Sequence, residues 1–257
     1  MDPYDFIVAK VQEAGALVMR LREGEFEKSI KENDPRNIVT SVDIAVSDFL
    51  IAEITKAFPG HTIYSEEKEA AFEEAEYLWT IDPIDGTQNF SRRIPHFSVV
   101  VGLVHKGTPV AGAVYNPITN ELYSFKKGSG AFLNGTPIHV SGITELAKAH
   151  VFLHAGRKSK DWEWGGSSYR TLLEHANKTG NFSGSALDIC FVAAGRIEAV
   201  VYGGLAGADV AAAVGILTEA GGVAVNGDGE PVSFTPEGKR FFAANNAQIL
   251  AQLRALI

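Results

Sequence analysis

The segment that most constrains this chain is Trp79–Phe90, which reads Trp-Thr-Ile-Asp-Pro-Ile-Asp-Gly-Thr-Gln-Asn-Phe. An apolar strand delivers two carboxylates, Asp82 and Asp85, and then Gly86 and Thr87 at an expected helix start. Carboxylates bind hard divalent cations such as Mg²⁺, and backbone N–H groups at a helix start bind phosphate oxygens. The segment therefore predicts phosphate chemistry. Proline, glycine and aspartate are also common in turns, so an ordinary strand-to-loop turn is the alternative.

Composition excludes several classes of protein. The 257 residues carry a net charge of −8, which argues against a general nucleic-acid binder. Cys190, the single cysteine, lies in an apolar run and is expected to be a buried core residue, with a catalytic thiol as the less favoured alternative. The N-terminus lacks the features of a signal peptide, and no apolar run reaches the roughly 18 residues of a membrane span. The chain is therefore expected to be cytoplasmic.

Residues 1–147 are expected to form an α+β half. Apolar residues recur at spacings of three and four from Ile7 to Leu21, which predicts a helix that ends near Gly24. The elements expected to follow are a two-stranded excursion with a polar, mobile middle at 25–40, a helix from Ser41 to Phe58, a strand at 62–64, an acidic helix at 68–76, a strand at 77–81 and an antiparallel meander over 97–133.

From about residue 148 the pattern changes to alternating strands and helices, so residues 148–257 are expected to form an α/β half. Strands are expected near 150–154, 181–183, 197–202, 222–225 and 241–244. Helices are expected near 165–179, 185–195, 209–220 and 246–256. The two halves are expected to pack as a single compact domain over 1–257.

Further carboxylates are expected near Asp82. Glu66 and Glu67 follow the strand that precedes the Asp82 strand, Asp43 lies in the first turn of a helix, and Asp209 lies just before an apolar helix. All of them fall at the ends of predicted elements, where sites are built on α/β sheets. For Asp209, a simple helix N-cap is the alternative.

These segments together resemble the inositol monophosphatase family of Mg²⁺-dependent, lithium-sensitive phosphatases. Besides Trp79–Phe90, the resemblance rests on residues 38–43, 65–67, 128–135, 184–186, 208–212 and 219–222, and it covers essentially the whole chain. It implies an α+β fold of the sugar-phosphatase type, a layered αβαβα sandwich. It also implies a homodimer with two or three Mg²⁺ ions per subunit.

The resemblance implies a role for each matching residue. One metal would be bound by Glu66, Asp82, the Ile84 carbonyl and Thr87, a second by Asp82, Asp85 and Asp209, and a weaker third near Glu67. Asp43 and Thr87 would orient the attacking water, with Glu66 in the same catalytic set. Phosphate and substrate would be bound by Asp85, Gly86, Thr87, Gly184, Ser185, Ala186, Tyr202 and Asp209.

Three positions depart from the family pattern. Ala208 stands where tryptophan is common, and Asn37 stands where an aspartate usually precedes the Ile-Val-Thr of the mobile loop. Tyr202 stands where inositol-selective members carry an acidic residue that binds ring hydroxyls. A tyrosine can make one hydrogen bond there, but this is not the same recognition.

Basic residues give a second, weaker indication about the substrate. Five of them are candidates to contact a second phosphate, with ordinary surface charge as the favoured alternative: Arg92, Arg93, Arg157, Lys158 and Lys160. The seven histidines show no ligand spacing and are expected to be structural or surface residues.

The leading functional hypothesis is a Mg²⁺-dependent phosphomonoesterase for a small phosphorylated polyol or sugar, with inositol monophosphate as the default substrate. Fructose 1,6-bisphosphate and histidinol phosphate are alternative substrates. The residues after Gly86-Thr87 make an adenosine 3′-phosphate less favoured. A non-enzymatic regulatory binding protein is an alternative of another class. Mutual repulsion of the carboxylates disfavours a purely structural oligomer.

Overall fold

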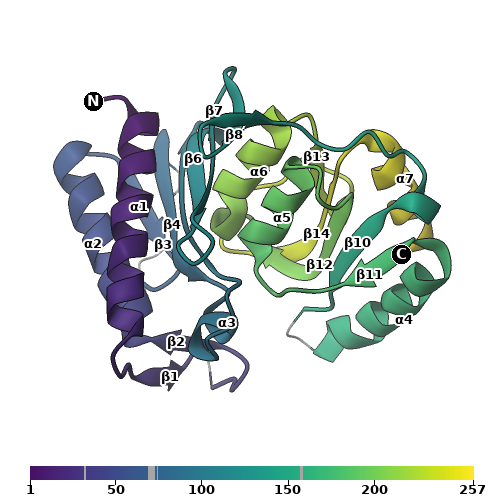
Figure 1. Cartoon of the computed structure of the whole chain (residues 1–257), viewed down its shortest axis with the longest axis horizontal. Helices are drawn as coiled ribbons and strands as arrows, with labels where there is room; N and C mark the ends of the chain where they lie inside the picture. Colours follow the sequence, from purple (N-terminus) through teal and green to yellow (C-terminus); the bar gives the residue numbers. More distant parts are fainter. Residues whose placement is uncertain (32, 69–72, 74, 157–158) are drawn as a thin grey trace.

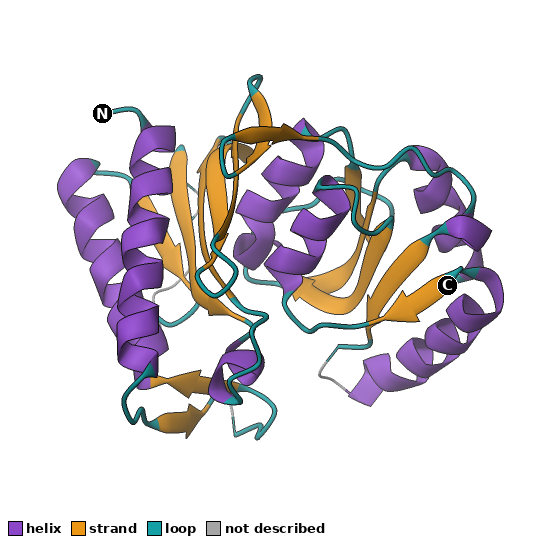
Figure 2. Ribbon diagram, viewed as in Figure 1, coloured by secondary structure: helices purple, strands orange, loops and turns teal. Residues whose placement is uncertain are grey.

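The computed structural model describes residues 1–257 except 32, 69–72, 74 and 157–158. Helices and sheets alternate in five layers, α–β–α–β–α (Figures 1 and 2). This confirms the predicted layered sandwich. Among the described residues, no helix is long and apolar enough to cross a membrane.

The first outer layer contains α1 (Pro3–Arg22) and α2 (Ser41–Ala57), which pack side by side on one face of a seven-stranded sheet (Figure 1). The apolar positions that predicted α1 are buried from Ile7 to Val18, because they lie on the helix stripe that faces the sheet. Below these helices, β1 (Lys28–Ile30) and β2 (Ile38–Thr40) form the expected two-stranded excursion.

The seven-stranded sheet runs in sequence order. Its strands are β3 (Thr62–Ser65), β4 (Tyr77–Asp85), β5 (Ser98–His105), β6 (Thr108–Asn116), β7 (Glu121–Lys126), β8 (Gly130–Leu133) and β9 (Thr136–Ile138). Only the β3–β4 pairing is parallel, so the predicted antiparallel meander is confirmed from β5 onward.

The middle layer contains α5 (Ser185–Ala193) and α6 (Ala211–Glu219), which lie between the two sheets (Figure 1). One buried apolar cluster joins both helices to both sheets. Small residues allow the close approach: a Cβ on Gly112 of β6 would lie 2.8 Å from the Cβ of Ala212. Cys190 of α5 is fully buried, as expected for a core residue, and burial raises the pKa of its thiol.

The second sheet has the order β11-β10-β12-β14-β13. Its strands are β10 (His150–His154), β11 (Lys178–Gly180), β12 (Ala199–Ala206), β13 (Val223–Asn226) and β14 (Gly238–Ala244). The last layer, α4 (Ser159–His175) and α7 (Ala247–Leu256), covers the outer face of this sheet.

Several predicted boundaries are wrong. The strand expected at 181–183 is β11, three residues earlier, and α4 begins at Ser159 rather than near 165. The described residues of the predicted helix at 68–76, namely 68, 73, 75 and 76, are not helical, and the rest lie outside the described part.

Candidate active site

A bulge in β4 brings the two aspartates of the signature to one side of the sheet. The predicted strand ended at Ile81, but β4 continues through Asp85. Asp82 pairs with Val100 and Asp85 pairs with Ser98, so three residues of β4 advance against two of β5. In a regular strand, side chains three residues apart point to opposite faces of the sheet. The extra residue of the bulge turns Asp85 to the same face as Asp82. Both carboxylates therefore line the same cavity.

The parallel pairing of β3 with β4 adds a third carboxylate. Ser65 pairs with Ile81, and the Glu66 amide donates to the Ile81 carbonyl at 3.1 Å. The carboxyl end of β3 thus places Glu66 beside Asp82. Asp209 reaches the same cavity from a short 3-10 helix, Gly207–Val210, ahead of α6.

The cavity has a volume of about 680 Å³ and is lined from both halves of the chain. Its acidic lining residues are Glu66, Asp82, Asp85 and Asp209, which we call the carboxylate end. Its aromatic lining residues are His154, Trp162 and Tyr202, which we call the aromatic wall. The remaining lining residues are Pro35, Arg36, Asn37, Ile38, Ile84, Gly86, Thr87, Gln88, Arg92, Gly156, Ser183, Ser185, Gly204 and Leu205.

Burial and mutual repulsion dominate the electrostatics of the carboxylate end. Burial, and after it the charges of Glu66, Asp85 and Asp209, raise the pKa of Asp82 well above its usual value. Burial also raises the pKa of Glu67 to about 7, with the charge of Glu66 as the next cause. These carboxylates are therefore costly to ionise together without added cations.

Lys31 supplies one positive charge to this region. Its ammonium lies 3.1 Å from Glu66 Oε1 and 2.9 Å from Glu67 Oε1. Although burial opposes the charge on Lys31, Glu66 and Glu67 raise its pKa. Because Lys31 extends from the β1–β2 excursion, this segment is tied to the end of β3.

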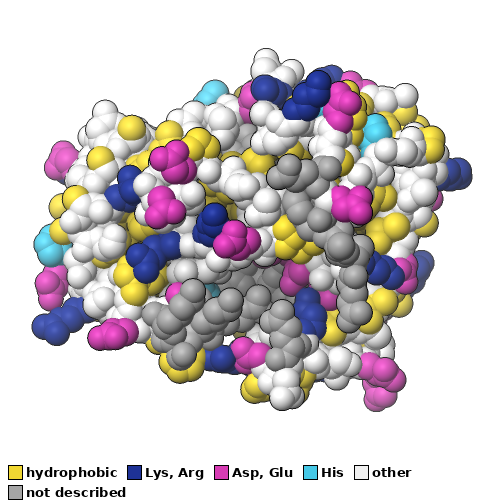
Figure 3. Space-filling view, turned by 180° about the vertical axis from the view of Figure 1, so that it is seen from behind, with side chains coloured by type: hydrophobic (Ala, Val, Ile, Leu, Met, Phe, Trp, Pro, Cys, Tyr) yellow, Lys and Arg dark blue, Asp and Glu magenta, His cyan; other side chains and the backbone are white. Residues whose placement is uncertain are grey.

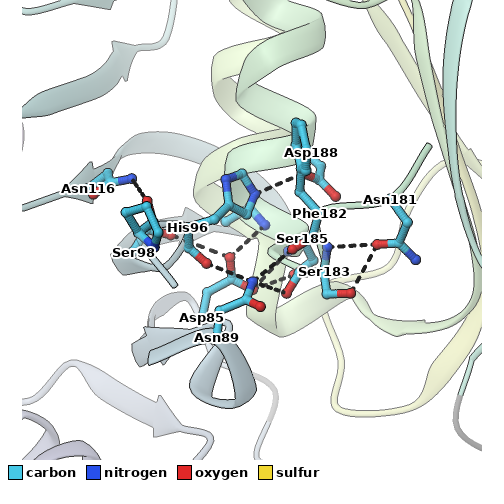
Figure 4. A network of polar contacts seen from close by, with 12 residues as sticks. Asp85, Asn89, His96, Ser98, Asn116, Asn181, Phe182, Ser183, Ser185 and Asp188 are labelled. Atoms are coloured by element: carbon cyan, nitrogen blue, oxygen red, sulfur yellow. Dashed lines mark hydrogen bonds and ion pairs between the residues drawn. The ribbon is translucent and has the colours of Figure 1, made fainter. Parts of the chain in front are cut away.

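Asp85 is held by the start of α5 (Figure 4). Its Oδ1 accepts from the Ser185 amide at 3.0 Å and from Ser185 Oγ at 2.7 Å, and its Oδ2 accepts from the Ala186 amide at 3.0 Å. Burial raises the pKa of Asp85, while these hydrogen bonds oppose that rise. Asp85 therefore links β4 to α5, which belong to different halves of the chain.

Asp43 and Thr87 form a hydrogen-bonded pair behind the cavity. Thr87 Oγ1 donates to Asp43 Oδ1 at 3.2 Å and lies 3.0 Å from the Ile84 carbonyl. The Thr40 amide donates to the other oxygen, Asp43 Oδ2, at 2.9 Å in a capping box at the start of α2. Burial raises the pKa of Asp43 to about 6. Its carboxylate is thus fixed toward the threonine hydroxyl.

The structure brings most of the expected site residues to one cavity. Those that line it are Glu66, Asp82, Ile84, Asp85, Gly86, Thr87, Ser185, Tyr202 and Asp209. Asp43, Glu67, Gly184 and Ala186 do not line it; Asp43 and Ala186 are fully buried, and Lys31 covers Glu67. The N-cap alternative for Asp209 is wrong, because Val210 caps α6 without a side-chain hydrogen bond.

Tyr202 has its hydroxyl turned into the protein. The hydroxyl donates to Asp188 Oδ2 at 2.7 Å, and Asp188 Oδ1 lies 3.0 Å from His96 Nε2. Figure 4 shows Asp188 and His96 beside the Asp85 network. Tyr202 is 5% exposed, so the cavity meets its ring and not a free hydroxyl.

Among the five basic candidates, Arg92 lines the cavity and Arg93 does not. Arg157, Lys158 and the side chain of Lys160 lie outside the part of the chain that the structure describes. On the face in Figure 3, the described Lys and Arg side chains are interspersed with Asp and Glu. The described part of this face therefore offers no continuous basic surface.

Of the aromatic wall, the sequence predicts only Tyr202. The histidines show no ligand spacing that would indicate His154, and no pattern indicates Trp162 or Arg36. His154 and Tyr202 are neighbours because β10 and β12 pair in parallel at these two residues. The alternation of strands and helices predicts a sheet but not the order of its strands. It therefore could not predict that His154 and Tyr202 are neighbours.

The oxygen atoms at the carboxylate end are of the type that binds a hard divalent cation, because Mg²⁺ prefers carboxylate and carbonyl oxygens. Among the described residues, however, no group of three His, Cys, Asp or Glu side chains forms a ready-made metal centre. Lys31 binds Glu66 and Glu67, and α5 binds Asp85. Three of the expected ligands, Glu66, Glu67 and Asp85, are therefore engaged with protein donors.

Comparison with known proteins identifies this architecture. Residues 2–257 match the inositol monophosphatase family. The chain is 34% identical to an inositol monophosphatase from Mesembryanthemum crystallinum, over 92% of this chain and 87% of the relative, and 35% identical to the Nus factor SuhB of Pseudomonas aeruginosa, over 82% and 80%. The solved structure of the Thermotoga maritima IMPase superimposes with a TM-score of 0.89 at 30% identity, covering 100% of this chain and 96% of that chain. The chain therefore belongs to the inositol monophosphatase family, whose members are phosphatase hydrolases.

Proposed function

We propose that this protein is a Mg²⁺-dependent phosphomonoesterase that hydrolyses a small phosphorylated polyol or sugar. The observation that carries the proposal is the convergence of Glu66, Asp82, Asp85 and Asp209 on one cavity beside Gly86 and Thr87. Family membership supports the class of reaction.

Two or three Mg²⁺ ions per subunit would be held by Glu66, Asp82, the Ile84 carbonyl, Thr87, Asp85 and Asp209, with Glu67 near the third. Bound Mg²⁺ supplies water activation and charge stabilisation on the phosphate oxygens. The raised pKa of Asp82 supports this assignment, because cations relieve the repulsion that burial amplifies.

The chain's own residues would orient the reactants. Asp43 fixes the direction of the Thr87 hydroxyl, so that the acceptor lone pairs of Thr87 Oγ1 can align a water molecule for attack. Gly86 caps α3 (Thr87–Ser91) with a left-handed φ of 87° that glycine adopts without strain, and a Cβ there would lie 3.1 Å from the His96 carbonyl oxygen. The Ser185 and Ala186 amides donate to the Asp85 carboxylate, so they would hold this metal-binding side chain in place.

Both halves of the chain line the cavity, so residues 1–257 would act as one functional domain. A cavity of about 680 Å³ is within the range for small-molecule sites. Inositol monophosphate is the first substrate to test, because the family is named for it. Lithium sensitivity belongs to the same proposal and is checked by adding Li⁺ to the assay.

A homodimer is also part of the proposal. Ile94 and Phe182 are 44% and 52% exposed, and the Asn89 side chain connects their two loops through the His96 and Phe182 carbonyls. A contiguous exposed apolar patch marks a protein contact, and we propose these two side chains as the centre of one. Sedimentation of the wild type as a dimer and of Phe182→Asp as a monomer supports the dimer; a monomeric wild type contradicts it.

The test is phosphate release with and without Mg²⁺ from inositol 1-phosphate, fructose 1,6-bisphosphate, histidinol phosphate and glycerol 2-phosphate. We expect Mg²⁺-dependent turnover that a chelator abolishes and added Mg²⁺ restores. Turnover that survives complete removal of metal contradicts the proposal.

A second role is favoured by two relatives named Nus factor SuhB, from Pseudomonas aeruginosa and Pasteurella multocida. In this alternative, the chain acts by binding a protein partner, without need of turnover. The alternative predicts a stable complex with such a partner that persists when Asp82→Asn removes phosphatase activity.

A further inference from the structure

His96 lies in the loop between α3 and β5, and its side chain joins this loop to the middle layer of the fold (Figure 4). His96 Nε2 lies 3.0 Å from Asp188 Oδ1, and Asp188 is in the first turn of α5. The other oxygen, Asp188 Oδ2, accepts from the Tyr202 hydroxyl of β12 at 2.7 Å. These three residues, which we call the His–Asp–Tyr chain, therefore connect a loop of the first half of the protein to α5 and to the second sheet.

The His96 ring also packs against the residue that caps α5. A Cβ on Gly184 would lie 2.7 Å from His96 Cδ2 and 2.9 Å from His96 Nε2. A side chain at position 184 would therefore displace the ring. The next two residues, Ser185 and Ala186, donate their amides to Asp85. The ring thus contacts the turn whose amides hold the Asp85 carboxylate.

Asn89 of α3 ties the same loop to the segment that leads into α5. Its Nδ2 donates to the His96 carbonyl at 2.8 Å and to the Phe182 carbonyl at 2.7 Å (Figure 4). Asn89 is 8% exposed, so these contacts lie inside the protein. The backbone of His96 is held from the side of α3, while its ring is held by the start of α5.

Two members of the His–Asp–Tyr chain lie outside the cavity lining. His96 and Asp188 do not line the cavity, whereas Asp85, which accepts from the α5 amides, does. Groups that hold a metal ligand without binding the metal typically change metal affinity by about 10- to 100-fold. Removing one partner of a buried carboxylate is also unfavourable, because an oxygen is left without its hydrogen bond. Loss of the His96 ring should therefore disturb the start of α5 and the amides that orient Asp85.

We propose that His96 is a positioning residue for the Mg²⁺ ion that Asp85 would bind. The ring fixes the start of α5 through Gly184 and Asp188, and the first amides of α5 then fix the Asp85 carboxylate. This inference rests on the proposed function, in which Asp85 is a metal ligand. It makes metal affinity depend on a contact between the two halves of the chain, at a residue outside the cavity.

The test measures Mg²⁺ binding to the full chain by calorimetric titration, without substrate. His96→Leu cannot hydrogen-bond to Asp188, and we expect the dissociation constant of one Mg²⁺ site to rise by about tenfold. His96→Gln carries an amide nitrogen at the same distance along the side chain as Nε2, so it should recover part of the affinity. Circular dichroism checks folding. If His96→Leu does not fold, His96→Asn takes its place, because its amide is too short to reach Asp188.

Ser141→Ala is the matched control, because it also removes a hydrogen bond to a buried acid. Ser141 Oγ donates to Glu198 Oε1 at 2.9 Å, Glu198 is 5% exposed, and neither residue lines the cavity. Urea unfolding should show a loss of stability in both variants, whereas Mg²⁺ affinity should fall only in His96→Leu. The comparison separates positioning of a metal ligand from a general loss of stability.

Unchanged Mg²⁺ affinity in His96→Leu, or an equal loss of affinity in Ser141→Ala, overturns the inference, and phosphate release by the wild type then still supports the proposed function. A wild type that binds Mg²⁺ but releases no phosphate contradicts the proposed function alone, and the same titration then decides the inference. A wild type that binds no Mg²⁺ overturns both.

Discussion

The carboxylate end and the aromatic wall line one cavity, but their polar groups have different partners. At the carboxylate end, buried acids crowd together and the pKa of Asp82 rises because of burial and its acidic neighbours. At the wall, the Tyr202 hydroxyl has a buried acidic partner, Asp188, and Arg36 pairs with Asp34 at the surface. We expect an added cation to stabilise the first region, whereas the polar groups of the second have partners without a ligand. Under the proposed function, the reaction takes place at the first region, and the second contacts the rest of the substrate.

Replacing Asp82 should have the largest effect. Asp82→Asn removes one anionic ligand from the centre of the carboxylate end, and loss of metal stabilisation worth several kcal/mol lowers kcat by at least about a thousandfold. The fold should remain, because the amide is nearly isosteric. Phosphate release and circular dichroism check this, and turnover within about tenfold of the wild type would show that the acids are not the reaction centre.

Removing the orienting carboxylate should have the next largest effect. Asp43→Asn keeps the shape but no longer fixes the Thr87 hydroxyl as a donor, so kcat should fall by about a hundredfold. KM should change little, since Asp43 does not line the cavity. Steady-state kinetics separate the two parameters. A change confined to KM would place Asp43 in substrate binding instead.

The stability of the metal-free protein should fall as pH rises. The pKa of Asp43 is raised to about 6 and that of Glu67 to about 7, mainly by burial. The native state therefore binds these protons more tightly than the unfolded state, and the stabilisation present below about pH 4 is lost as pH rises through about 6 to 7. At about 1.36 kcal/mol per pKa unit, each group accounts for at most about 3 kcal/mol.

Urea unfolding at pH 5 and pH 8 in a chelator measures this loss. Asp43→Asn should show a smaller difference between the two pH values, and Mg²⁺ should reduce the difference in the wild type. Equal or greater stability of the metal-free wild type at pH 8 is the contrary result.

A smaller effect should come from the wall. Tyr202→Phe keeps the ring but removes the hydroxyl that donates to Asp188, which should cost about 1–3 kcal/mol of stability. KM for the substrates of the phosphate-release assay should stay close to that of the wild type, because the hydroxyl faces the protein. A large rise in KM would mean that the hydroxyl contacts the substrate.

The smallest effect should come from Lys31. Lys31→Met removes the ammonium from Glu66 and Glu67, so both acids become available to a cation. Apparent affinity for Mg²⁺ should rise by about threefold, as expected for a partly exposed ion pair. Calorimetric titration gives the affinity, with Lys28→Met on the same excursion as control. Weaker Mg²⁺ binding would show that Lys31 supports the site rather than competing for it.

The sequence predicted Glu66, Asp82 and Asp85 because they are close along the chain or follow neighbouring strands. Asp209 comes from the second half of the chain, and its place at the end of a predicted element and the family resemblance indicated it. The spacing of Asp82 and Asp85 before Gly86 carried the prediction for these two aspartates, and the layered fold was confirmed. The spacing could not show how both aspartates reach one face, since a period of two predicts opposite faces and only the bulge at Pro83–Ile84 reverses this.

The wall was missed for a different reason. Trp162 lies on a helix where an exposed aromatic residue has no distinguishing pattern, and the Tyr202–Asp188 contact depends on packing of α5 against β12. Tyr202 was noted as a departure from an acidic position. Its hydroxyl turned out to be engaged by Asp188, a residue that no motif had indicated.

The most direct test of the carboxylate end is a crystal structure with Mn²⁺ in place of Mg²⁺, which locates the metal by its anomalous scattering. We predict peaks within about 2.3 Å of carboxylate oxygens of Asp82, shared with Glu66 on one side and with Asp85 and Asp209 on the other. Lys31 should then no longer bridge Glu66 and Glu67. A cavity without an anomalous peak, with Lys31 still bound to both glutamates at saturating Mn²⁺, would contradict the account.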